Sequence, residues 1–302
     1  MRVILFGAGA SYGSESVYPY PPPLGAGLFD ELQKHYPKVW GTIPASDRTK
    51  FVPNFELGMK EVWDSSSHVA PVLMRCLADY FARFRAGQSN VYARLLECLQ
   101  YYGALEGTVF SSLNYECVLE TAARNYGISR IEYFEKSTTG ASVLTVWKLH
   151  GSCNFLPESV VGDASAVSYS GAAVSWDGEM RIVDPVHVGP FVSQNAFYPA
   201  MAVFMEGKPI HSHQTAIKEI QTRWRAAITE SDIVGIIGVF PNETDTHLWD
   251  PLSDTSAAAV VIGDVKAYEG WKTRRRVGKR SEIVGDQFAR DLPKFAEVFA
   301  KT

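Results

Sequence analysis

Residues 1–11 read MRVILFGAGAS, an apolar run that passes directly into a glycine-rich turn. Residues 2–6 are too uniformly apolar to alternate between a core face and a solvent face, so they predict a strand buried on both sides. Such strands are typical of parallel sheets covered by helices on both faces. The opening therefore predicts an α/β fold.

Further apolar runs continue the alternation of strands and helices. Strands are predicted at 108–113, 130–134, 143–149, 233–238 and 258–263, and helices at 24–35, 115–125, 214–227 and 285–301. The alternation favours a mainly parallel, Rossmann-like sheet with helices on both faces. Residues 151–213, rich in Gly, Ser, Ala and Pro, predict loops and short strands.

Residues 54–102 carry apolar side chains at helical spacing almost throughout. We expect a helical module of about residues 37–103, inserted after the first strand–helix unit of one domain that spans residues 1–302. The composition, 46% hydrophobic and 21% charged, is that of a globular protein.

A net charge of −4 gives no general attraction to nucleic acid, so we expect no direct nucleic-acid binding. No apolar run approaches the ~18–20 residues that span a bilayer, and the first strand is too short for a signal peptide, so we expect a cytoplasmic protein without membrane contact. The four cysteines show no CxxC spacing, which predicts reduced thiols and no bound metal.

The turn after the first strand is the first candidate ligand site. Glycine there lets a backbone approach a ligand closely and turn its N–H groups toward phosphate, although a tight structural turn explains the pattern equally well. Tyr12 stands where a dehydrogenase fingerprint needs its third glycine, and prolines follow, so a Rossmann dehydrogenase is disfavoured. The candidate residues of this turn are Gly7, Ala8, Gly9 and Ser11.

Polar residues follow the later strands. Asn114 and Glu116 come after the strand at 108–113. Asn114 fits a helix N-cap, and the same loop can also contact a ligand. His150 ends the strand at 143–149 beside a glycine, which suits a general base or a structural histidine. Gly238 and Asp264 close the two last strands, each beginning a polar loop of the kind that covers a nucleotide.

Other histidines and a basic run have simpler interpretations. His211 and His213 form a His-x-His pair without a third ligand, and we interpret them as solvent-exposed loop residues. The basic run is expected to be a solvated loop, with a grip on DNA or an acidic partner as the alternative. It comprises Lys272, Arg274, Arg275, Arg276, Lys279 and Arg280.

Taken in order, these segments resemble the sirtuin-like family of bacterial NAD-consuming proteins. Residues 7–11 match its GAGxS, residues 113–116 its TNYD, and residues 149–151 its LHG. Residues 233–245 resemble its late strand and loop, and residues 54–56 and 90–96 also resemble segments of that branch.

The chain departs from the family at two places: Glu116 replaces the usual aspartate, and Gly238-Val239-Phe240 lacks the hydroxyl of the late GxS. Protein deacylases of the superfamily carry paired CxxC motifs for zinc, and this chain has none. The resemblance therefore implies the branch that hydrolyses NAD to nicotinamide and ADP-ribose, met as the effector of anti-phage defence systems.

The resemblance also implies roles. Asn114 would hold the ribose and orient the attacking water, and His150 would act as base. The Gly7–Ser11 turn would cradle the pyrophosphate, with Glu116 and Gly238 nearby and Asp264 near the adenosine. Family members act as oligomers, so we expect a homo-oligomer gated by a partner protein. The alternatives are a deacylase or ADP-ribosyltransferase, and a non-catalytic nucleotide sensor.

Overall fold

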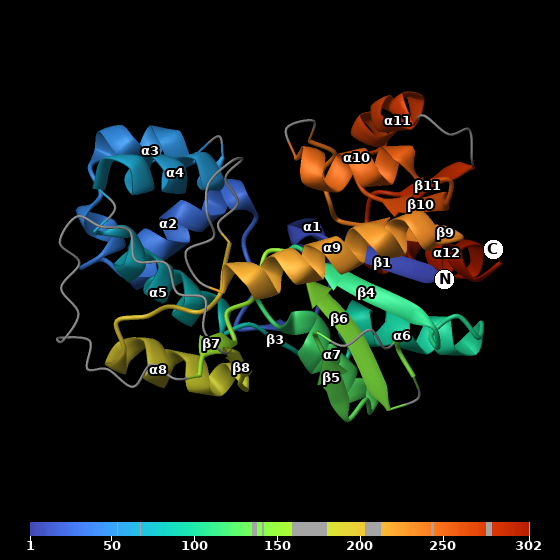
Figure 1. The fold of residues 1–302 in the computed structure, drawn as a ribbon, viewed down its shortest axis with the longest axis horizontal. Helices are drawn as coiled ribbons and strands as arrows, with labels where there is room; N and C mark the ends of the chain where they lie inside the picture. The colour runs from blue at the N-terminus through green and yellow to red at the C-terminus, as the bar shows by residue number, and fades with distance from the viewer. Residues whose placement is uncertain are drawn as a thin grey trace.

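A seven-stranded, fully parallel sheet forms the centre of the molecule, in the order β11-β10-β9-β1-β4-β6-β5 (Figure 1). The computed structural model describes residues 1–52, 54–66, 68–134, 138–140, 142–158, 180–202, 213–242, 245–275 and 280–301. The strands are β1 (Arg2–Phe6), β4 (Thr108–Ser112), β5 (Arg130–Glu132), β6 (Val143–Lys148), β9 (Ile233–Ile237), β10 (Ala258–Ile262) and β11 (Ser281–Gly285). The predicted α/β class and parallel sheet are confirmed.

β1 lies at the middle of this sheet, between β4 and β9. Arg2 is in register with Thr108 on one side and with Ile233 on the other. The side chains of Val3, Ile4, Leu5 and Phe6 are fully buried, as expected of a strand covered on both faces. The chain builds the sheet on one side of β1 first and then crosses to β9 on the other side.

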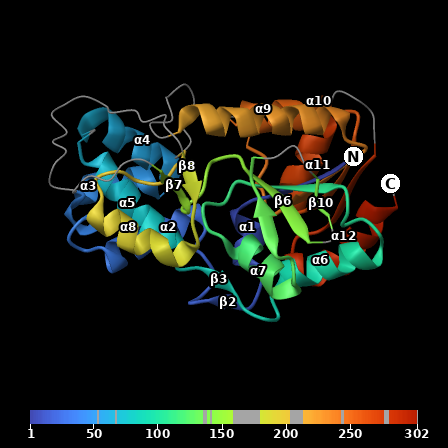
Figure 2. The same ribbon diagram turned by 60° about the horizontal axis from the view of Figure 1, so that its bottom comes forward.

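Helices cover both faces of the sheet, as Figure 2 shows. One layer holds α6 (Val91–Tyr101), α7 (Val118–Tyr126) and α12 (Phe288–Ala300). The opposite layer holds α9 (Gln214–Glu230), α10 (Thr246–Asp254) and α11 (Val265–Arg274). α9 is fixed to the sheet by two side chains: Trp224 donates from Nε1 to Ser111 Oγ, and Gln221 donates to the carbonyl of Leu149.

A second group of helices lies beside the sheet, toward the left of Figure 1. It contains α2 (Gly25–His35), α3 (Ala45–Phe51), α4 (Phe55–Ser66) and α5 (Ala70–Phe81), which pack on one another around aromatic residues such as Trp40 and Phe51. α8 (Val188–Gln194) packs on α5, and α6 packs on α7 and α12 instead.

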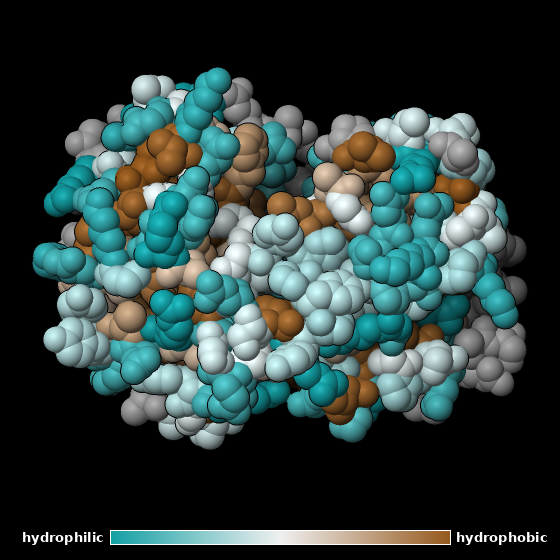
Figure 3. Space-filling view, turned by 180° about the vertical axis from the view of Figure 1, so that it is seen from behind, coloured by the Kyte–Doolittle hydropathy of each residue, from teal (hydrophilic) through white to brown (hydrophobic). Residues whose placement is uncertain are grey.

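The remaining short elements are α1 (Ala8–Tyr12), β2 (Val17–Tyr18), β3 (Arg85–Ala86), β7 (Phe155–Pro157), β8 (Met180–Ile182) and two 3-10 turns, η1 (Trp40–Thr42) and η2 (Pro185–His187). Short strands within 151–213 were predicted, whereas α8 was not. The face seen in Figure 3 is mainly hydrophilic, with hydrophobic residues in small groups. In the described part of the chain, no helix has the length and apolar character needed to cross a membrane.

Some local predictions need correction. The helix after β4 begins at Val118 rather than at Tyr115, so Asn114 is not its N-cap. His213 is buried at the start of α9 instead of exposed, and His211 lies outside the described residues. Lys272 and Arg274 belong to α11, while Arg276 and Lys279 lie outside the described residues.

Arg275 is not a solvated residue either. Its guanidinium donates to the carbonyls of Thr255 and Ala257, to Ser281 Oγ, and lies over the ring of Trp271. Burial lowers the pKa of Arg275 from its usual value. This residue therefore joins β10, β11 and α11 rather than offering a charge to a partner.

Candidate functional site

A cavity of about 640 Å³ opens at the carboxyl ends of the parallel strands. β1, β4, β6, β9 and β10 each end at its wall, and each contributes a predicted site residue from the loop that follows. A volume of this size is typical of small-molecule sites. The cavity is lined by every predicted site residue: Gly7, Ala8, Gly9, Ser11, Asn114, Glu116, His150, Gly238 and Asp264.

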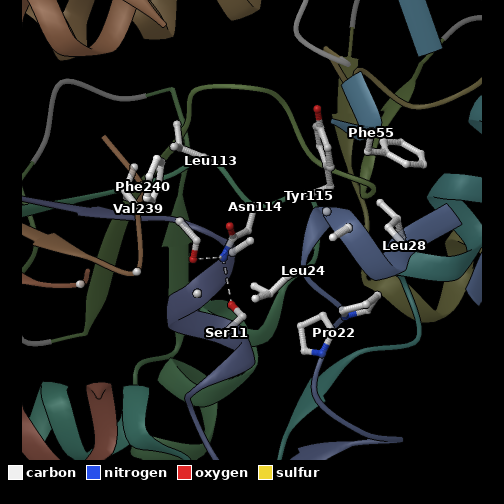
Figure 4. A pocket seen from close by; sticks show the side chains of 18 of the residues that line it. Ser11, Pro22, Leu24, Leu28, Phe55, Leu113, Asn114, Tyr115, Val239 and Phe240 are labelled. Atoms are coloured by element: carbon white, nitrogen blue, oxygen red, sulfur yellow. Dashed lines mark hydrogen bonds between the residues drawn. The ribbon is translucent and has the colours of Figure 1, made fainter. Parts of the chain in front are cut away.

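Asn114 joins two of these loops (Figure 4). Its Nδ2 donates to the carbonyl oxygen of Gly7 at 3.0 Å and to Ser11 Oγ at 2.9 Å. Because an amide nitrogen carries two hydrogens, both donors of Asn114 are used inside the protein. Oδ1 is then the atom of this side chain that can accept a hydrogen bond from a ligand.

Ser11 is the hub of the buried network beneath Asn114. Its hydroxyl donates to Glu116 Oε1 at 2.5 Å and lies 2.8 Å from the hydroxyl of Tyr92. A serine hydroxyl has one donor and two acceptor positions, and Glu116, Tyr92 and Asn114 occupy all three. Ser11 therefore holds its neighbours in place and keeps no hydrogen-bonding position for a phosphate.

Glu116 is buried in the same network. The N-cap of α7 is Cys117, and Glu116 Oε2 accepts from the backbone N–H of Val118, the first residue of that helix, at 2.5 Å. Burial raises the pKa of Glu116, and the positive charge of Lys148 and the bond from Ser11 partly offset this. The carboxylate of Glu116 thus accepts hydrogen bonds from Ser11 and from the first residue of α7.

Lys148 supports this loop from the end of β6. Its Nζ donates to the carbonyl of Glu116 at 2.6 Å and lies 3.1 Å from Glu120 Oε1. Burial is the largest single influence on the pKa of Lys148 and lowers it, yet the surrounding groups, Glu120 first, together outweigh burial and raise the pKa. Both side chains are buried, so this is a paired internal charge that fixes the position of Glu116.

The turn of residues 7–9 is built by close packing against β9. Gly9 donates its N–H to the carbonyl of Gly238 at 3.0 Å, so this amide is already used. Gly238 has φ +65°, and a Cβ there would lie 2.0 Å from the nitrogen of Ala10. Ala8 opens α1, where the first N–H groups of a helix have no partner within it. Among the residues predicted to bind the pyrophosphate, Ala8 is the one best placed to donate a backbone N–H to a ligand.

His150 follows β6 and lines the cavity. Its carbonyl accepts from Ala202, and the next residue, Gly151, has φ +75° with no room for a Cβ beside the carbonyl of Ala200. Burial, with a further effect from His247, lowers the pKa of His150 to about 3. His150 is thus a neutral imidazole at neutral pH, as a general base must be.

Several residues that line the cavity were not predicted as site residues. Apolar side chains face the cavity from both sides: Leu24, Leu28 and Phe55 from the helical group, and Val239 and Phe240 after β9 (Figure 4). Phe240 is 65% exposed. A hydrophobic residue just before or after a polar loop gives no sequence signal of its own, so these positions were missed.

Carboxylates also line the cavity: Glu56, Glu116, Asp245, Asp264 and Asp286. Among the described lining residues there is no lysine or arginine. Burial, and next the charge of Asp245, raise the pKa of Glu56 to about 8. Asp264 accepts from the N–H of Ala267 and so caps α11 from the edge of the cavity. The described residues contain no group of three or more side chains that could hold a metal ion.

The chain was compared with protein families, with curated proteins and with solved structures, and matches were found among the solved structures. No protein family matches the chain, and no curated protein does. A Sir2 homologue mutant in complex with ADP-ribose aligns at a TM-score of 0.48 and 11% identity, over 99% of this chain and 92% of its own. A structure of Sir2 in complex with the inhibitor EX-527, 2'-O-acetyl-ADP-ribose and a deacetylated p53 peptide aligns at 0.43 and 11%, over 100% and 93%.

A third structure, from work on the mechanism and regulation of Sir2 enzymes, aligns at a TM-score of 0.45 and 13% identity, over 99% of this chain and 91% of its own. At such identities a likeness concerns the fold, and the chemistry of the cavity rests on its own residues. All three of these structures are described as Sir2 structures or Sir2 homologues.

Proposed function

We propose that this chain hydrolyses NAD+ at the bond between nicotinamide and ribose, giving nicotinamide and ADP-ribose. The observation that carries the proposal is the position of Asn114 and His150 at one cavity, with Asn114 bonded to the glycine turn. Five strand ends converge there, as at ligand sites of open α/β sheets.

Asn114 acts through its carbonyl oxygen. Since Nδ2 is bonded to Gly7 and Ser11, Oδ1 faces the ligand with its negative dipole end fixed. In hydrolysis of this bond, positive charge develops on the ribose as nicotinamide leaves. A fixed dipole stabilises that charge without reorganising, and the same oxygen can accept a hydrogen bond from a ribose hydroxyl or from the attacking water.

His150 takes the proton from the attacking water or from a ribose hydroxyl. Burial, and next His247, lower the pKa of His150 to about 3, so the ring is unprotonated at neutral pH. The pyridinium of NAD+ is a good leaving group, so the reaction needs little acid assistance. One base and one fixed dipole are then sufficient to promote hydrolysis of the bond between nicotinamide and ribose.

The charge of the cavity fits a substrate that carries a cation. NAD+ brings a positive pyridinium together with its negative phosphates, and the lining offers the carboxylates of Asp245, Asp264 and Asp286. Cleavage neutralises the pyridinium and leaves ADP-ribose with only negative charge. The carboxylates then repel the product, which favours its release. The phosphates would bind through backbone N–H groups such as that of Ala8.

The experiment is incubation of the 302-residue chain with NAD+, followed by chromatography of the products. The wild type should release equal amounts of nicotinamide and ADP-ribose, and His150→Ala should release neither. His187→Ala, at an exposed histidine of η2, is the matched control and should behave as the wild type. If the chain binds ADP-ribose but does not cleave NAD+, the result would contradict hydrolysis and favour a nucleotide sensor.

The motif resemblance extends the proposal to a cellular role. As an anti-phage effector, the chain would act in the cytoplasm as a homo-oligomer gated by a partner protein. Light scattering tests assembly, and plating of phage on cells that carry the wild type or His150→Ala tests defence. Equal plating on both strains, or a monomer that is fully active by itself, would contradict this extension.

A further inference from the structure

His150 stands against a second imidazole. Its Nε2 lies 3.3 Å from Nε2 of His247, and the two ring centroids are 5.6 Å apart with a tilt of 32°. His247 belongs to the first turn of α10, and it is not among the described residues that line the cavity. The contact therefore joins a ring of the cavity wall to a ring outside that wall.

Two imidazole nitrogens at this distance share one hydrogen. One nitrogen carries the hydrogen and donates it, and the other presents its lone pair. Because a neutral imidazole has one N–H, the choice at Nε2 also decides the state of Nδ1 on the same ring. The contact thus sets the tautomer of His150 as well as the orientation of its ring.

The surroundings keep this pair neutral. Burial, and then the positive charge of Arg225 on α9, lower the pKa of His247 to about 4. Lys148, on β6, donates to the carbonyl of Glu116 and pairs with Glu120. Asp245 precedes α10, and its charge raises the pKa of Glu56. At neutral pH both rings are uncharged. Once one ring of the pair is protonated, its positive charge disfavours protonation of the other ring.

We propose that His247 is the positioning residue of His150, which it holds in one orientation and one tautomer. In that tautomer Nε2 of His150 donates to Nε2 of His247, and Nδ1 of His150 presents its lone pair to the proton. This inference rests on the proposed function, because it assigns His150 the part of the base.

Proton transfer strengthens the contact. When a water or a ribose hydroxyl gives its proton to His150, its O–H bond breaks, an N–H bond forms at Nδ1, and the ring becomes a cation. The Nε2–H of that cation then donates to the neutral His247. A hydrogen bond from a charged donor is about twice as strong as a neutral one, so His247 stabilises the charge at the moment it forms.

Two substitutions at position 247 separate positioning from packing. His247→Gln keeps a polar group that can accept from His150, and His247→Leu keeps volume without an acceptor. The Leu variant should lower kcat for NAD+ about 10-fold or more, short of the ~10²–10⁴-fold that loss of the base itself causes. KM should stay within about two-fold, since His247 does not line the cavity. The Gln variant should recover most of kcat.

His187→Gln and His187→Leu are the matched controls, because His187 is an exposed histidine away from the cavity. Both should leave kcat and KM unchanged. A Leu variant of His247 with wild-type kcat would overturn the proposal. So would equal losses in the Gln and Leu variants, because these would indicate packing alone. If the Leu variant fails to fold, His247→Asn, which is polar but too short to reach, takes its place.

Nitrogen-15 spectra of labelled histidine test the contact without turnover. His150 should show one tautomer in the wild type and in His247→Gln, and a mixture of tautomers in His247→Leu. The same spectrum in all three proteins would overturn the inference. If the spectra change as expected but the wild type never cleaves NAD+, the proposed function fails and the histidine contact remains, so the two failures are distinguishable.

Discussion

Nδ2 of Asn114 lies 3.0 Å from the carbonyl oxygen of Gly7, which precedes it by 107 residues. This bond ties the loop after β4 to the loop after β1, and the second bond of the same nitrogen, to Ser11, fixes the direction of the amide. The buried network that orients Asn114 therefore belongs to the site as much as its Oδ1 does.

Asn114→Ala should abolish nicotinamide release and lower the stability slightly. The substitution removes Oδ1 from the cavity and two hydrogen bonds from a buried network, which costs on the order of 1–3 kcal/mol. A chain of this size should stay folded after such a loss. Thermal unfolding and product chromatography measure the two effects, and wild-type turnover in this variant would remove Asn114 from the mechanism.

The rate should be insensitive to acid over the ordinary range of pH. A base works when it is unprotonated, and the pKa of His150 is lowered to about 3. Protonation of His150 should therefore not reduce kcat between about pH 5 and pH 8. A pH profile of kcat provides the measurement. An acid limb near the ordinary histidine pKa of ~6.5 that disappears in His150→Ala would show that the ring is not desolvated as described.

Ligand binding should weaken as the pH rises through about 8. Glu56, whose pKa is raised to about 8, is mainly neutral at pH 7 and gains its negative charge above that value. The new charge lies beside Asp245 and repels an anionic ligand. Titration of ADP-ribose by calorimetry at pH 6.5 and pH 9 should show this loss, and Glu56→Gln should bind equally at both values.

Glu56 also makes stability depend on pH, with a definite sign. Its folded-state pKa is raised above the usual value of 4.5, so between about 4.5 and 8 the folded chain binds more protons than the unfolded chain. Its contribution to stability is therefore greatest at low pH and falls as the pH rises through that window. Glu56→Gln should raise Tm at pH 9 relative to the wild type, and it should change Tm little at pH 5.

Gly238→Ala should destabilise the chain more than Gly103→Ala, a substitution at a glycine with a similar positive φ. Gly238 and Gly103 have φ values of +65° and +68°, but a Cβ at 238 meets backbone at 2.0 Å whereas one at 103 meets nothing within 4 Å. Gly103→Ala should cost about 1 kcal/mol, for the backbone strain alone. Gly238→Ala should cost clearly more and abolish ADP-ribose binding. Equal losses in chemical unfolding would contradict the close packing of the two loops.

Six of the seven strands of the sheet, and the positions of the loops that line the cavity, were predictable because each depends on local pattern. Runs such as residues 2–6 are uniformly apolar, and parallel strands present their carboxyl ends at one edge. The helices α10 and α11 and the strand β11 were missed, since their apolar positions are few and polar residues interrupt them.

What the sequence could not provide is pairing between distant side chains. Asn114 fits an N-cap by local chemistry, yet tertiary hydrogen bonds to Gly7 and Ser11 take its amide. The contact of His247 with His150 and the effect of Asp245 on Glu56 depend on how loops far apart in the chain approach in space. Burial of His213 likewise follows from packing at the start of α9 and not from its polar surroundings in the sequence.

The central position of β1 has a consequence for how the protein is made. β1 is synthesised first, but one of its neighbours, β9, begins only at Ile233. Until β9 emerges from the ribosome, one edge of β1 stays open to pairing with other chains, and long-range parallel pairing is slow. The growing chain should therefore be prone to aggregation, and its yield should respond to chaperones and to lower growth temperature.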